Sequence, residues 1–346
     1  MDRTIKAAVL GATGYTGSEL IYILSSHPNV ELVFLGSDKS KRLDIESLHK
    51  DFSTKNLPYV KPYKEIELSN VDVVFTSLPH NVSHEWVKEN FNKSKIIDLS
   101  ADFRLNNSKI YKENYLNEHS CPELLNKFIY GLSEINSKII ANTDYVAVPG
   151  CYPTSILLPL IPLIKNKLIN TNNIIIDSKS GYSGAGKNFD KKNIYSNNEL
   201  NFYNYNTNNH RHICEIYQEL TKHTESEINF SFNPHLLPIF RGMMSTIYCD
   251  LSKDSNQEDI LDSLSNYYSN SSFVKIIKDD SKNDFFSVQN TNNCLIRLLK
   301  HYDSSKIIIS SVIDNLLKGA SGQAVQCMNL MFDLKDSKGL ENLKSV

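Results

Sequence analysis

A cysteine lies at a position where a fold can make it a nucleophile. Cys151 follows a tight turn, Val148-Pro149-Gly150, that separates a short apolar segment, Tyr145 to Val148, from a long apolar run. We expect its thiol to lie in the first turn of a helix, where unpaired backbone N–H groups and the helix dipole favour the thiolate. The alternative is a small buried apolar residue, as many lone cysteines are.

A thiolate here needs a second stabilising group. A free thiol with a pKa of about 8.5 is only about 3% ionised at pH 7, and lowering that pKa to about 7 requires roughly 2 kcal/mol. A helix terminus supplies about 0.3 to 1 kcal/mol, so a cation such as an imidazolium must supply the rest. The segment HRHICE, at 210–215, resembles the start of a helix on which His212 and Glu215 share a face. His212, oriented by Glu215, is therefore the candidate partner of Cys151.

The same histidines could belong to a metal site. His210 and His212 are separated by one residue, as two metal ligands can be, but a third ligand with suitable spacing is not evident. We therefore expect no metal.

Composition limits the classes of function. The 346 residues are enough for two domains, and 37 Lys and Arg against 39 Asp and Glu give a net charge of -2, which argues against nucleic-acid binding. A charged start and the lack of a long apolar run predict neither a signal peptide nor a membrane span. Six cysteines without a CxxC pair favour reduced thiols and a cytoplasmic location.

The first half of the chain has the pattern of a parallel sheet with helices between its strands. An apolar strand, Ile5 to Leu10, leads through a glycine turn into a helix, and a second strand, Val30 to Gly36, completes a βαβ unit. Further apolar runs follow at Val71 to Leu78, Lys95 to Leu99 and Tyr145 to Val148. This order predicts a doubly wound parallel sheet.

After Cys151 the strands become longer, and many alternate apolar with polar residues, which predicts a second α/β domain with a mixed sheet. The expected strands are Ile174 to Lys179, Ile228 to Phe232, Met244 to Leu251, Asn293 to Leu299 and Lys306 to Ile313. The polar and aromatic segment Asn201 to Asn209 lacks a period, so we expect a loop there.

The glycine turn between the first strand and helix is a candidate dinucleotide site. It reads GATGYTG, a GxxGxxG pattern, and its position lets backbone N–H groups approach a pyrophosphate at the helix N-terminus. The alternative is a plain tight turn. The candidate cofactor residues of this turn are Gly11, Thr13, Gly14, Tyr15, Thr16 and Gly17.

The end of the second strand favours NADP over NAD. Ser37 offers a hydroxyl, and Lys41 and Arg42 offer cations, where a 2′-phosphate would lie. Asp38 argues the other way, because a carboxylate at this point can bind the ribose hydroxyl of NAD. A solvated basic loop is the remaining alternative.

A second glycine-rich segment imitates a phosphate-binding loop. Residues 181–187, GYSGAGK, fit G-x-x-x-x-G-K, but Asn188 follows where a nucleotide triphosphatase needs Ser or Thr for magnesium. We interpret the segment as a flexible loop near the active site.

Several motifs together resemble the N-acetyl-gamma-glutamyl-phosphate reductase family, in order over nearly the whole chain. They are GATGYTGSEL (11–20), SADFRL (100–105), VPGCYPTSILLPL (148–160), SGYSGAGK (180–187), HRHICEI (210–216), PHLLPIFRG (234–242) and DNLLKGASGQAVQCMNLM (314–331). The resemblance implies a fold similar to aspartate-semialdehyde dehydrogenase. It implies a Rossmann NADP-binding domain at 1–148, a catalytic and dimerisation domain at 149–313, and a C-terminal helix, within 314–346, that returns to the first domain.

The resemblance also implies an activity: NADPH-dependent reduction of N-acetyl-L-glutamyl 5-phosphate to the 5-semialdehyde through a Cys151 thioester, in arginine biosynthesis. His212 would exchange the proton. It further implies a homodimer or homotetramer. The residues implied for the nicotinamide side are Ser180, Gly181, Ser183, Asn315 and Lys318, and the candidates for substrate binding are Arg104, Lys187, His210, Arg211 and Arg241. The alternative for each of the arginines is a structural salt bridge.

Other interpretations stay open at this point. An aspartate-semialdehyde or N-acetyl-aminoadipyl-phosphate reductase would use the same covalent chemistry on a substrate of different length. A dinucleotide-sensing module could keep the fold without turnover, although Cys151, His212 and Glu215 argue for an enzyme.

Overall fold

The computed structural model describes residues 4–38, 57–196, 199–279, 281–341 and 343. The chain forms two compact units: unit 1 is Met1–Pro149 with Ala320–Val346, and unit 2 is Gly150–Gly319. The chain therefore leaves unit 1 just before Cys151 and returns to it after Gly319. Each unit is described below by itself.

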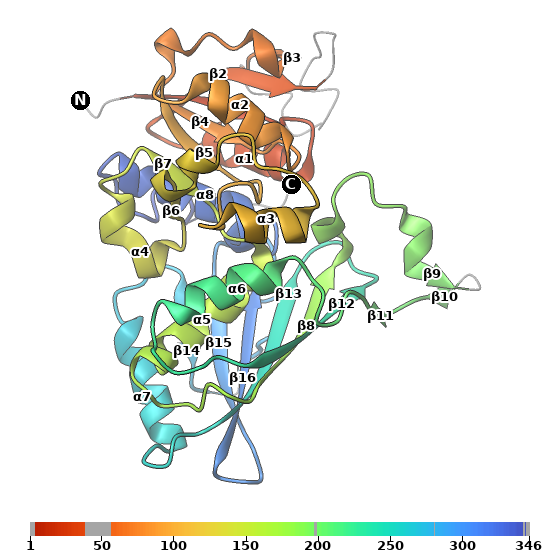
Figure 1. The fold of residues 1–346 in the computed structure, drawn as a ribbon, viewed down its shortest axis with the longest axis vertical. Coiled ribbons are helices and arrows are strands. Elements are labelled where there is room, and N and C mark those ends of the chain that lie inside the picture. The colour runs from red at the N-terminus through yellow and green to blue at the C-terminus, as the bar shows by residue number, and fades with distance from the viewer. Residues whose placement is uncertain (1–3, 39–56, 197–198, 280, 342, 344–346) are drawn as a thin grey trace. The chain divides into compact units, whose positions relative to one another are not determined.

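Unit 1 is built on a parallel sheet of seven strands in the order β3-β2-β1-β4-β5-β7-β6 (Figure 1). The order reverses between β1 and β4, as in a doubly wound sheet, and the glycine turn follows β1 at this point. The strands are β1 (Ile5–Leu10), β2 (Val30–Ser37), β3 (Val60–Pro62), β4 (Val73–Thr76), β5 (Lys95–Asp98), β6 (Ile129–Tyr130) and β7 (Tyr145–Ala147). The predicted fold class is confirmed here.

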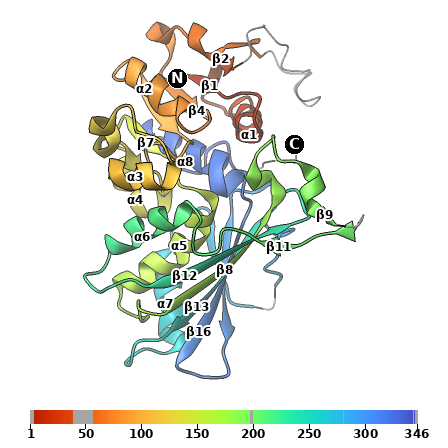
Figure 2. The ribbon, with the colours of Figure 1, turned by 45° about the vertical axis from the view of Figure 1, so that its right-hand side comes forward.

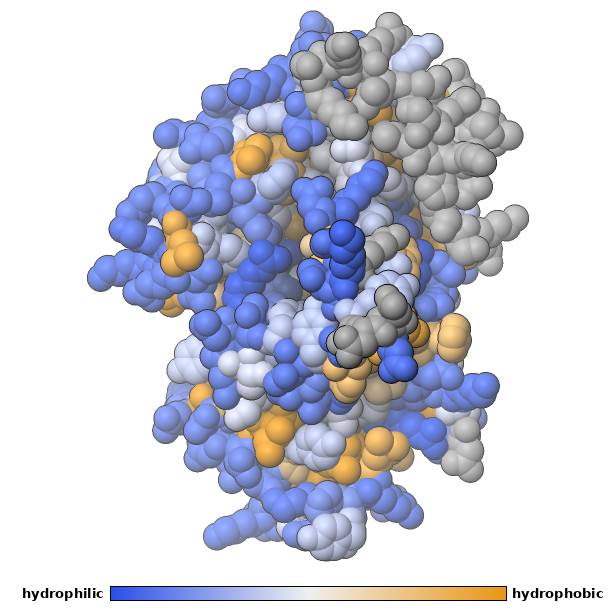
Figure 3. All heavy atoms as spheres, turned by 90° about the vertical axis from the view of Figure 1, so that its right-hand side faces the viewer, coloured by the Kyte–Doolittle hydropathy of each residue, from blue (hydrophilic) through white to orange (hydrophobic). Residues whose placement is uncertain are grey.

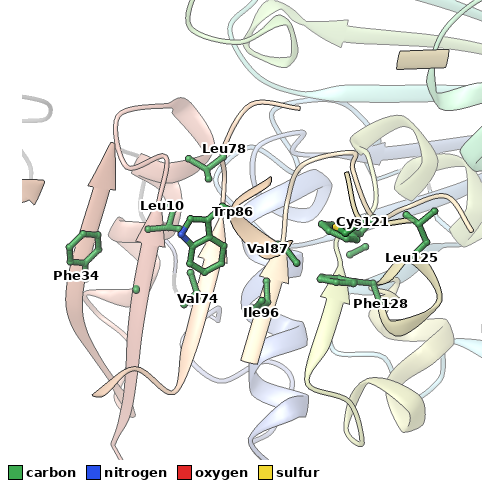
Figure 4. Close-up of a cluster of buried hydrophobic side chains, with 13 residues drawn as sticks. Leu10, Phe34, Val74, Leu78, Trp86, Val87, Ile96, Cys121, Leu125 and Phe128 are labelled. Carbon is green, nitrogen blue, oxygen red and sulfur yellow. The ribbon is translucent and has the colours of Figure 1, made fainter. Parts of the chain in front are cut away.

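Helices cover both faces of this sheet, which is why its central strands are continuous apolar runs. On one face, Trp86 and Val87 of α2 pack on Leu10, Val74 and Ile96 (Figure 4). On the other face, α8 contacts α1, α4 and β5. The helices of unit 1 are α1 (Tyr15–Leu24), α2 (Val82–Asn90), α3 (Ser108–Tyr115), α4 (Ser133–Ile140) and α8 (Gly322–Met331).

The helix predicted at the C-terminus differs in its first turns from an ordinary α-helix. It begins as a π-helical turn, η8 (Leu317–Ser321), and α8 continues from Gly322. The physical reason is that Gly319 N–H donates to the carbonyl of Asp314, five residues back. Nine of the ten residues of α8 are buried, so its place against the sheet is determined by packing on every side.

Unit 2 holds a mixed sheet in the order β11-β12-β8-β13-β16-β15-β14, as predicted. The pairs β12–β8 and β14–β15 are parallel, and the other pairs are antiparallel. Its strands are β8 (Ile174–Gly181), β11 (Tyr203–Asn204), β12 (Phe230–Leu237), β13 (Met243–Asp250), β14 (Val274–Ile277), β15 (Cys294–Lys300) and β16 (Lys306–Ile313). The strands β9 (Tyr195–Ser196) and β10 (Glu199–Leu200) form a separate pair.

Three helices lie on one side of this sheet: α5 (Cys151–Lys165), α6 (His212–Thr221) and α7 (Gln257–Tyr267) (Figure 2). The helix α5 contacts β13, β16, α6 and α7. Its residues from Tyr152 to Ile164 are all buried, so α5 is the central helix of the unit. This burial makes its N-terminus, where Cys151 lies, a rigid position.

The prediction of a loop at 201–209 is partly wrong, because β11 within it pairs with Leu236 and His235 of β12.

Short 3₁₀ turns complete the structure: η3 (Tyr63–Glu65), η4 (Leu68–Asn70), η5 (Pro122–Lys127), η6 (Tyr182–Ala185) and η7 (Lys191–Ile194). Within the described part of the chain, every helix is too short or too polar to cross a bilayer.

Candidate active site

Cys151 is the first residue of α5, as its sequence context predicts. Gly150 is the N-cap, in an extended conformation with φ −65° and ψ 156°, and it makes no side-chain cap hydrogen bond. The thiol forms no disulfide and is partly exposed. A partly exposed thiol at an N-terminus without a side-chain cap is placed to gain from the helix dipole and from first-turn N–H groups.

Glu215 connects α6 to the start of α5. Its Oε1 accepts a hydrogen bond of 2.9 Å from the N–H of Gly150, and the side chain is 1% exposed. The sequence predicts that Glu215 orients His212, and this stays a prediction; the hydrogen bond that the structure gives for its carboxylate holds the backbone N–H just before Cys151. This carboxylate therefore fixes the position of α6, and with it His212, against the N-terminus of α5.

His212 is the first residue of α6 and is buried. Its ring lies 6.0 Å, centroid to centroid, from that of Tyr152, the residue after Cys151. The helices α5 and α6 pack side by side (Figure 1), and the Glu215–Gly150 hydrogen bond joins their first turns, so Cys151 and His212 lie in the same part of unit 2. Their roles as nucleophile and proton donor stay predictions.

The neutral ring of His210 accepts a hydrogen bond from the backbone of His212. Its Nδ1 accepts a hydrogen bond of 3.1 Å from the backbone N–H of His212, so the ring proton must be on Nε2. Burial, helped by the nearby Arg211, lowers the pKa of His210 to about 4. The ring is therefore neutral at pH 7, and of its two nitrogens Nε2 is the one that can donate a hydrogen bond.

The arginines proposed for anion binding differ in their surroundings. Arg104 of unit 1 is buried and donates to the carbonyls of Val148 and Leu99, at 2.7 and 3.1 Å. Arg241 is also buried and forms an ion pair with Asp314. Arg211, in contrast, is exposed at the N-cap of α6, beside His212. Lys187 is exposed as well.

The second glycine-rich segment forms a compact turn on unit 2. Three N–H groups, of Gly181, Tyr182 and Ser183, donate to carbonyls of residues 239–242 at 2.9 Å. A side chain at position 181 would put its Cβ 2.6 Å from the carbonyl oxygen of Phe240, so this close crossing requires glycine. The residues after Lys187 form a turn and not a helix, which agrees with the rejection of a phosphate-binding loop.

Ser183 and Asn315 are brought together by the fold. Asn315 donates from Nδ2 to Ser183 Oγ at 2.8 Å and accepts from the N–H of Gly242 at 2.8 Å. Ser180, at the end of β8, donates to the carbonyl of Gly181. Lys318 is fully buried, with its ammonium 5.9 Å from the ring centroid of Phe273. The family resemblance implied all four as cofactor contacts, and the structure brings Ser180, Ser183 and Asn315 together around Gly184.

The glycine turn of unit 1 fits a dinucleotide. Added Cβ atoms at Gly11 and Gly17 would lie 2.1 and 2.2 Å from carbonyl oxygens, of Ser77 and Gly11, so these two glycines serve the tight turn itself. At Gly14, the N-cap of α1, the nearest atom to an added Cβ is 3.5 Å away. A glycine that the protein itself does not require, at a helix N-terminus without a side-chain cap, leaves the space that a pyrophosphate needs.

Of the residues predicted to select NADP or NAD, the structure describes Ser37 and Asp38. Ser37 is buried at the end of β2, and Asp38 is exposed. Lys41 and Arg42, which the sequence assigned to the 2′-phosphate, lie outside the described residues.

Tyr205 is a residue that the sequence reasoning missed. Its hydroxyl lies 3.1 Å from that of Tyr152, and burial raises the pKa of Tyr205 to about 12. The ring also packs edge-on to His210. The signal in the sequence that could have indicated Tyr205 is the set of aromatic residues in an otherwise polar segment just before HRH.

Among the described residues, no cluster of His, Cys, Asp or Glu could hold a metal ion.

Comparison with known families and proteins agrees with this geometry. Residues 6–143 match the NAD binding domain of semialdehyde dehydrogenases, and residues 151–315 match their dimerisation domain. The chain is 42% identical to N-acetyl-gamma-glutamyl-phosphate reductase of Caldicellulosiruptor bescii, covering 97% of this chain and 98% of that protein. The chain belongs to the N-acetyl-gamma-glutamyl-phosphate reductase family. The resemblance predicted from its motifs is confirmed.

Two further relatives carry the same name. The reductase of Ehrlichia canis is 41% identical, with 99% of each chain covered. A probable chloroplastic reductase of Arabidopsis thaliana is 40% identical over 98% of this chain and 84% of that protein.

Solved structures of low identity share the fold of this reductase family member. Aspartate semialdehyde dehydrogenase II of Vibrio cholerae, in complex with ASA, has a TM-score of 0.72 at 18% identity, with 96% of this chain and 99% of that chain covered. The aspartate semialdehyde dehydrogenase of Candida albicans, solved with NADP, has a TM-score of 0.65 at 17% identity, with 95% and 98% covered. The predicted likeness in fold is confirmed.

Proposed function

We propose that this protein reduces N-acetyl-L-glutamyl 5-phosphate to N-acetyl-L-glutamate 5-semialdehyde with NADPH, and releases phosphate, as a step of arginine biosynthesis. The observation that carries the proposal is a partly exposed Cys151 at the N-terminus of α5, which contacts a helix that begins with His212. Relatives at about 40% identity, named for this substrate, support the choice of acyl phosphate.

The cysteine chemistry follows from these positions. The Cys151 thiolate attacks the acyl carbon, a C–S bond forms, and the bond from that carbon to the phosphate oxygen breaks. The departing phosphate takes a proton from the His212 imidazolium, which leaves a neutral imidazole and a thioester. NADPH, when bound, supplies the hydride that takes the acyl group to the aldehyde level. Collapse of the resulting thiohemiacetal breaks the C–S bond and restores the thiolate, and His212 takes its proton back from solvent.

Arg211 and Lys187 are the residues we propose for the substrate's charged groups, because both are exposed and lie in the segments that carry His212 and Ser183. A guanidinium suits phosphate or carboxylate, since it donates two parallel hydrogen bonds. His210 contributes through Nε2–H, because Nδ1 is occupied by the backbone of His212.

For the cofactor, we propose that the turn 11–17 holds the pyrophosphate at the N-terminus of α1, with Thr13, Tyr15 and Thr16 beside the glycines. Ser180, Gly181, Ser183, Asn315 and Lys318 are proposed for the nicotinamide side. The choice of NADP rests on Ser37, Lys41 and Arg42, and Asp38 is the residue that would favour NAD.

The test runs the reaction backwards. N-acetyl-L-glutamate 5-semialdehyde and phosphate are added with NADP or NAD, and reduction of the nicotinamide is followed by its absorbance. The key variant is Cys151→Ala, and Cys214→Ala is the matched control, because Cys214 is likewise partly exposed and forms no disulfide.

Phosphate-dependent reduction of NADP that disappears in Cys151→Ala and survives in Cys214→Ala would support the substrate, cofactor and nucleophile together. Turnover with aspartate semialdehyde or an aminoadipate analogue alone would refute the substrate and keep the mechanism. Binding of NADP without any turnover would refute the enzyme and favour a sensing module.

We also propose a homodimer or homotetramer in the cytoplasm. Ile175, Tyr248, Ile308 and Leu299 form a row across β8, β13, β16 and β15, on the side of each strand opposite the buried positions. Ile175 is 46% exposed and Tyr248 is 40% exposed. Figure 3 shows one side of the molecule, on which apolar residues form separate patches within a mostly hydrophilic surface. Tyr248→Glu should lower the mass measured by light scattering.

The cytoplasmic location is proposed because none of the six cysteines forms a disulfide, which suits a reducing compartment.

A further inference from the structure

Gly319 packs so closely on the nucleophile that only glycine fits there. A Cβ added at position 319 would lie 2.7 Å from Cβ and 3.2 Å from Cα of Cys151. Neither atom is the end of a flexible side chain, so the backbone of Cys151 or the turn itself would have to move. Reaching the 3.4 Å of an ordinary contact requires a shift of about 0.7 Å.

The turn that carries Gly319 is organised by Asp314. In the π-helical turn Leu317–Ser321, the N–H of Gly319 donates to the carbonyl of Asp314 at 3.0 Å. The Asp314 side chain accepts from the N–H groups of Leu316 and Leu317, at 2.9 and 3.3 Å. The side chain of Asp314 is fully buried. Its main chain and its carboxylate therefore both determine where Gly319 lies.

Asp314 is in turn held by Arg241. The guanidinium Nε lies 2.9 Å from Asp314 Oδ2, and Arg241 Nη1 donates to Asn290 Oδ1 at 2.7 Å. The N–H of Asn290 donates to the same Asp314 oxygen at 2.8 Å. These three contacts form a closed triangle between the end of β16, the segment after β12 and the segment before β15. A buried ion pair that is tied to a third residue by hydrogen bonds from both partners holds a defined geometry.

We propose that Arg241 and Asp314 are positioning residues for Cys151 and that they act on it through Gly319. Gly319 packs closely against the Cα and Cβ of Cys151. This packing limits the directions in which Sγ can point. Small misplacement of a reacting atom is costly, since a shift of about 1 Å can lower the rate about 100-fold. The inference rests on the proposed function, because it requires Cys151 to be the nucleophile. It also gives Arg241 a role distinct from the substrate binding predicted from sequence.

The experiment compares Gly319→Ala with Gly131→Ala. At Gly131, in unit 1, an added Cβ would meet Val146 Cγ1 at 2.7 Å, so the crowding is similar but remote from Cys151 in its contacts. For each variant we would measure kcat and KM in the reverse reaction, Tm, and the pH profile of Cys151 alkylation by iodoacetamide, with the modified residue identified by mass spectrometry. We expect Gly319→Ala to lower kcat about 10- to 100-fold with KM within about twofold, and to shift the alkylation profile.

Gly131→Ala should lower Tm but keep the wild-type kcat and alkylation profile. Asp314→Asn and Arg241→Lys provide the second test, which does not depend on folding of the crowded variant. Asn keeps the shape of Asp314 without its charge, and Lys lacks the fork that reaches both Asp314 and Asn290. Both should lower kcat, leave KM within about twofold and change the alkylation profile in the same direction as Gly319→Ala.

The two ideas fail in different ways. If Cys151→Ala is inactive while Gly319→Ala and Asp314→Asn keep the wild-type kcat and alkylation profile, the positioning role is refuted and the proposed function stands. If Arg241→Lys raises KM about 10-fold and leaves the alkylation profile unchanged, Arg241 binds substrate and the proposal for it is overturned. If Cys151→Ala keeps its activity, the proposed function itself is wrong.

Discussion

Replacing Glu215 separates two roles that its carboxylate can have at the start of α5. The first role is to accept the 2.9 Å hydrogen bond from the N–H of Gly150, and the second is to orient His212 on the same helix. Glu215→Gln keeps an acceptor oxygen and removes the charge. Glu215→Ala removes the acceptor and leaves the Gly150 N–H without this partner in a buried place.

The expected losses in the free energy of unfolding follow from the burial of the Glu215 side chain. A hydrogen bond to a charged group contributes about 1.5 to 3 kcal/mol, and a buried donor left unsatisfied costs about 1 to 3 kcal/mol. Glu215 is 1% exposed, so water cannot easily replace the carboxylate. We expect Glu215→Ala to lower the free energy of unfolding by about 2 to 4 kcal/mol, including the lost packing. Glu215→Gln should lose about 1 kcal/mol, because its amide oxygen can accept the same bond.

The assay is urea unfolding followed by circular dichroism, combined with kcat and KM in the reverse reaction. Stability reports on the Gly150 contact, and kcat of the stable Glu215→Gln variant reports on the effect of the charge at His212. We expect kcat of Glu215→Gln to fall about 10-fold or more with KM little changed. If Glu215→Ala unfolds within about 0.5 kcal/mol of the wild type, the reasoning about the Gly150 contact is refuted.

Three other changes have distinct expected outcomes. Gly14→Ala should raise KM for NADPH about 10-fold without lowering Tm. Gly17→Ala should lower Tm, because its Cβ would lie 2.2 Å from the Gly11 carbonyl oxygen. Equal losses of Tm in the two variants would contradict the cofactor role of Gly14. Arg211→Gln should raise KM for phosphate or the semialdehyde, while Arg104→Gln should mainly lower Tm because its partners are carbonyls; the opposite pattern would exchange their roles. The pKa of folded His210 is about 4, below its unfolded value near 6.5, so the unfolded state binds more protons between these values and stability falls as pH drops through that window. His210→Asn, which can accept the same N–H, should weaken that dependence by up to about 3 kcal/mol between pH 7 and 4, and an unchanged slope would argue against a buried neutral ring.

Local sequence was sufficient to predict many of the elements. The strand Ile5–Leu10, the glycine turn after it and the helix that begins at Cys151 are all encoded within short segments, because apolar period and turn chemistry act over a few residues. The helix start that carries His212 and Glu215 was predicted for the same reason, and the catalytic roles of these residues stay predictions. The motif order was specific enough to predict the family, and with it the fold of both units.

Only the tertiary structure decided how these segments meet. The contact of Glu215 with Gly150 joins residues 65 positions apart, and no local pattern specifies it. The same holds for Arg241, which the sequence assigned to substrate and which the fold pairs with Asp314, and for Gly319, whose missing side chain makes room for Cys151. The physical reason is that periodicity and propensity describe a segment against solvent, whereas ion pairs and close approaches depend on which buried segments become neighbours when the core packs.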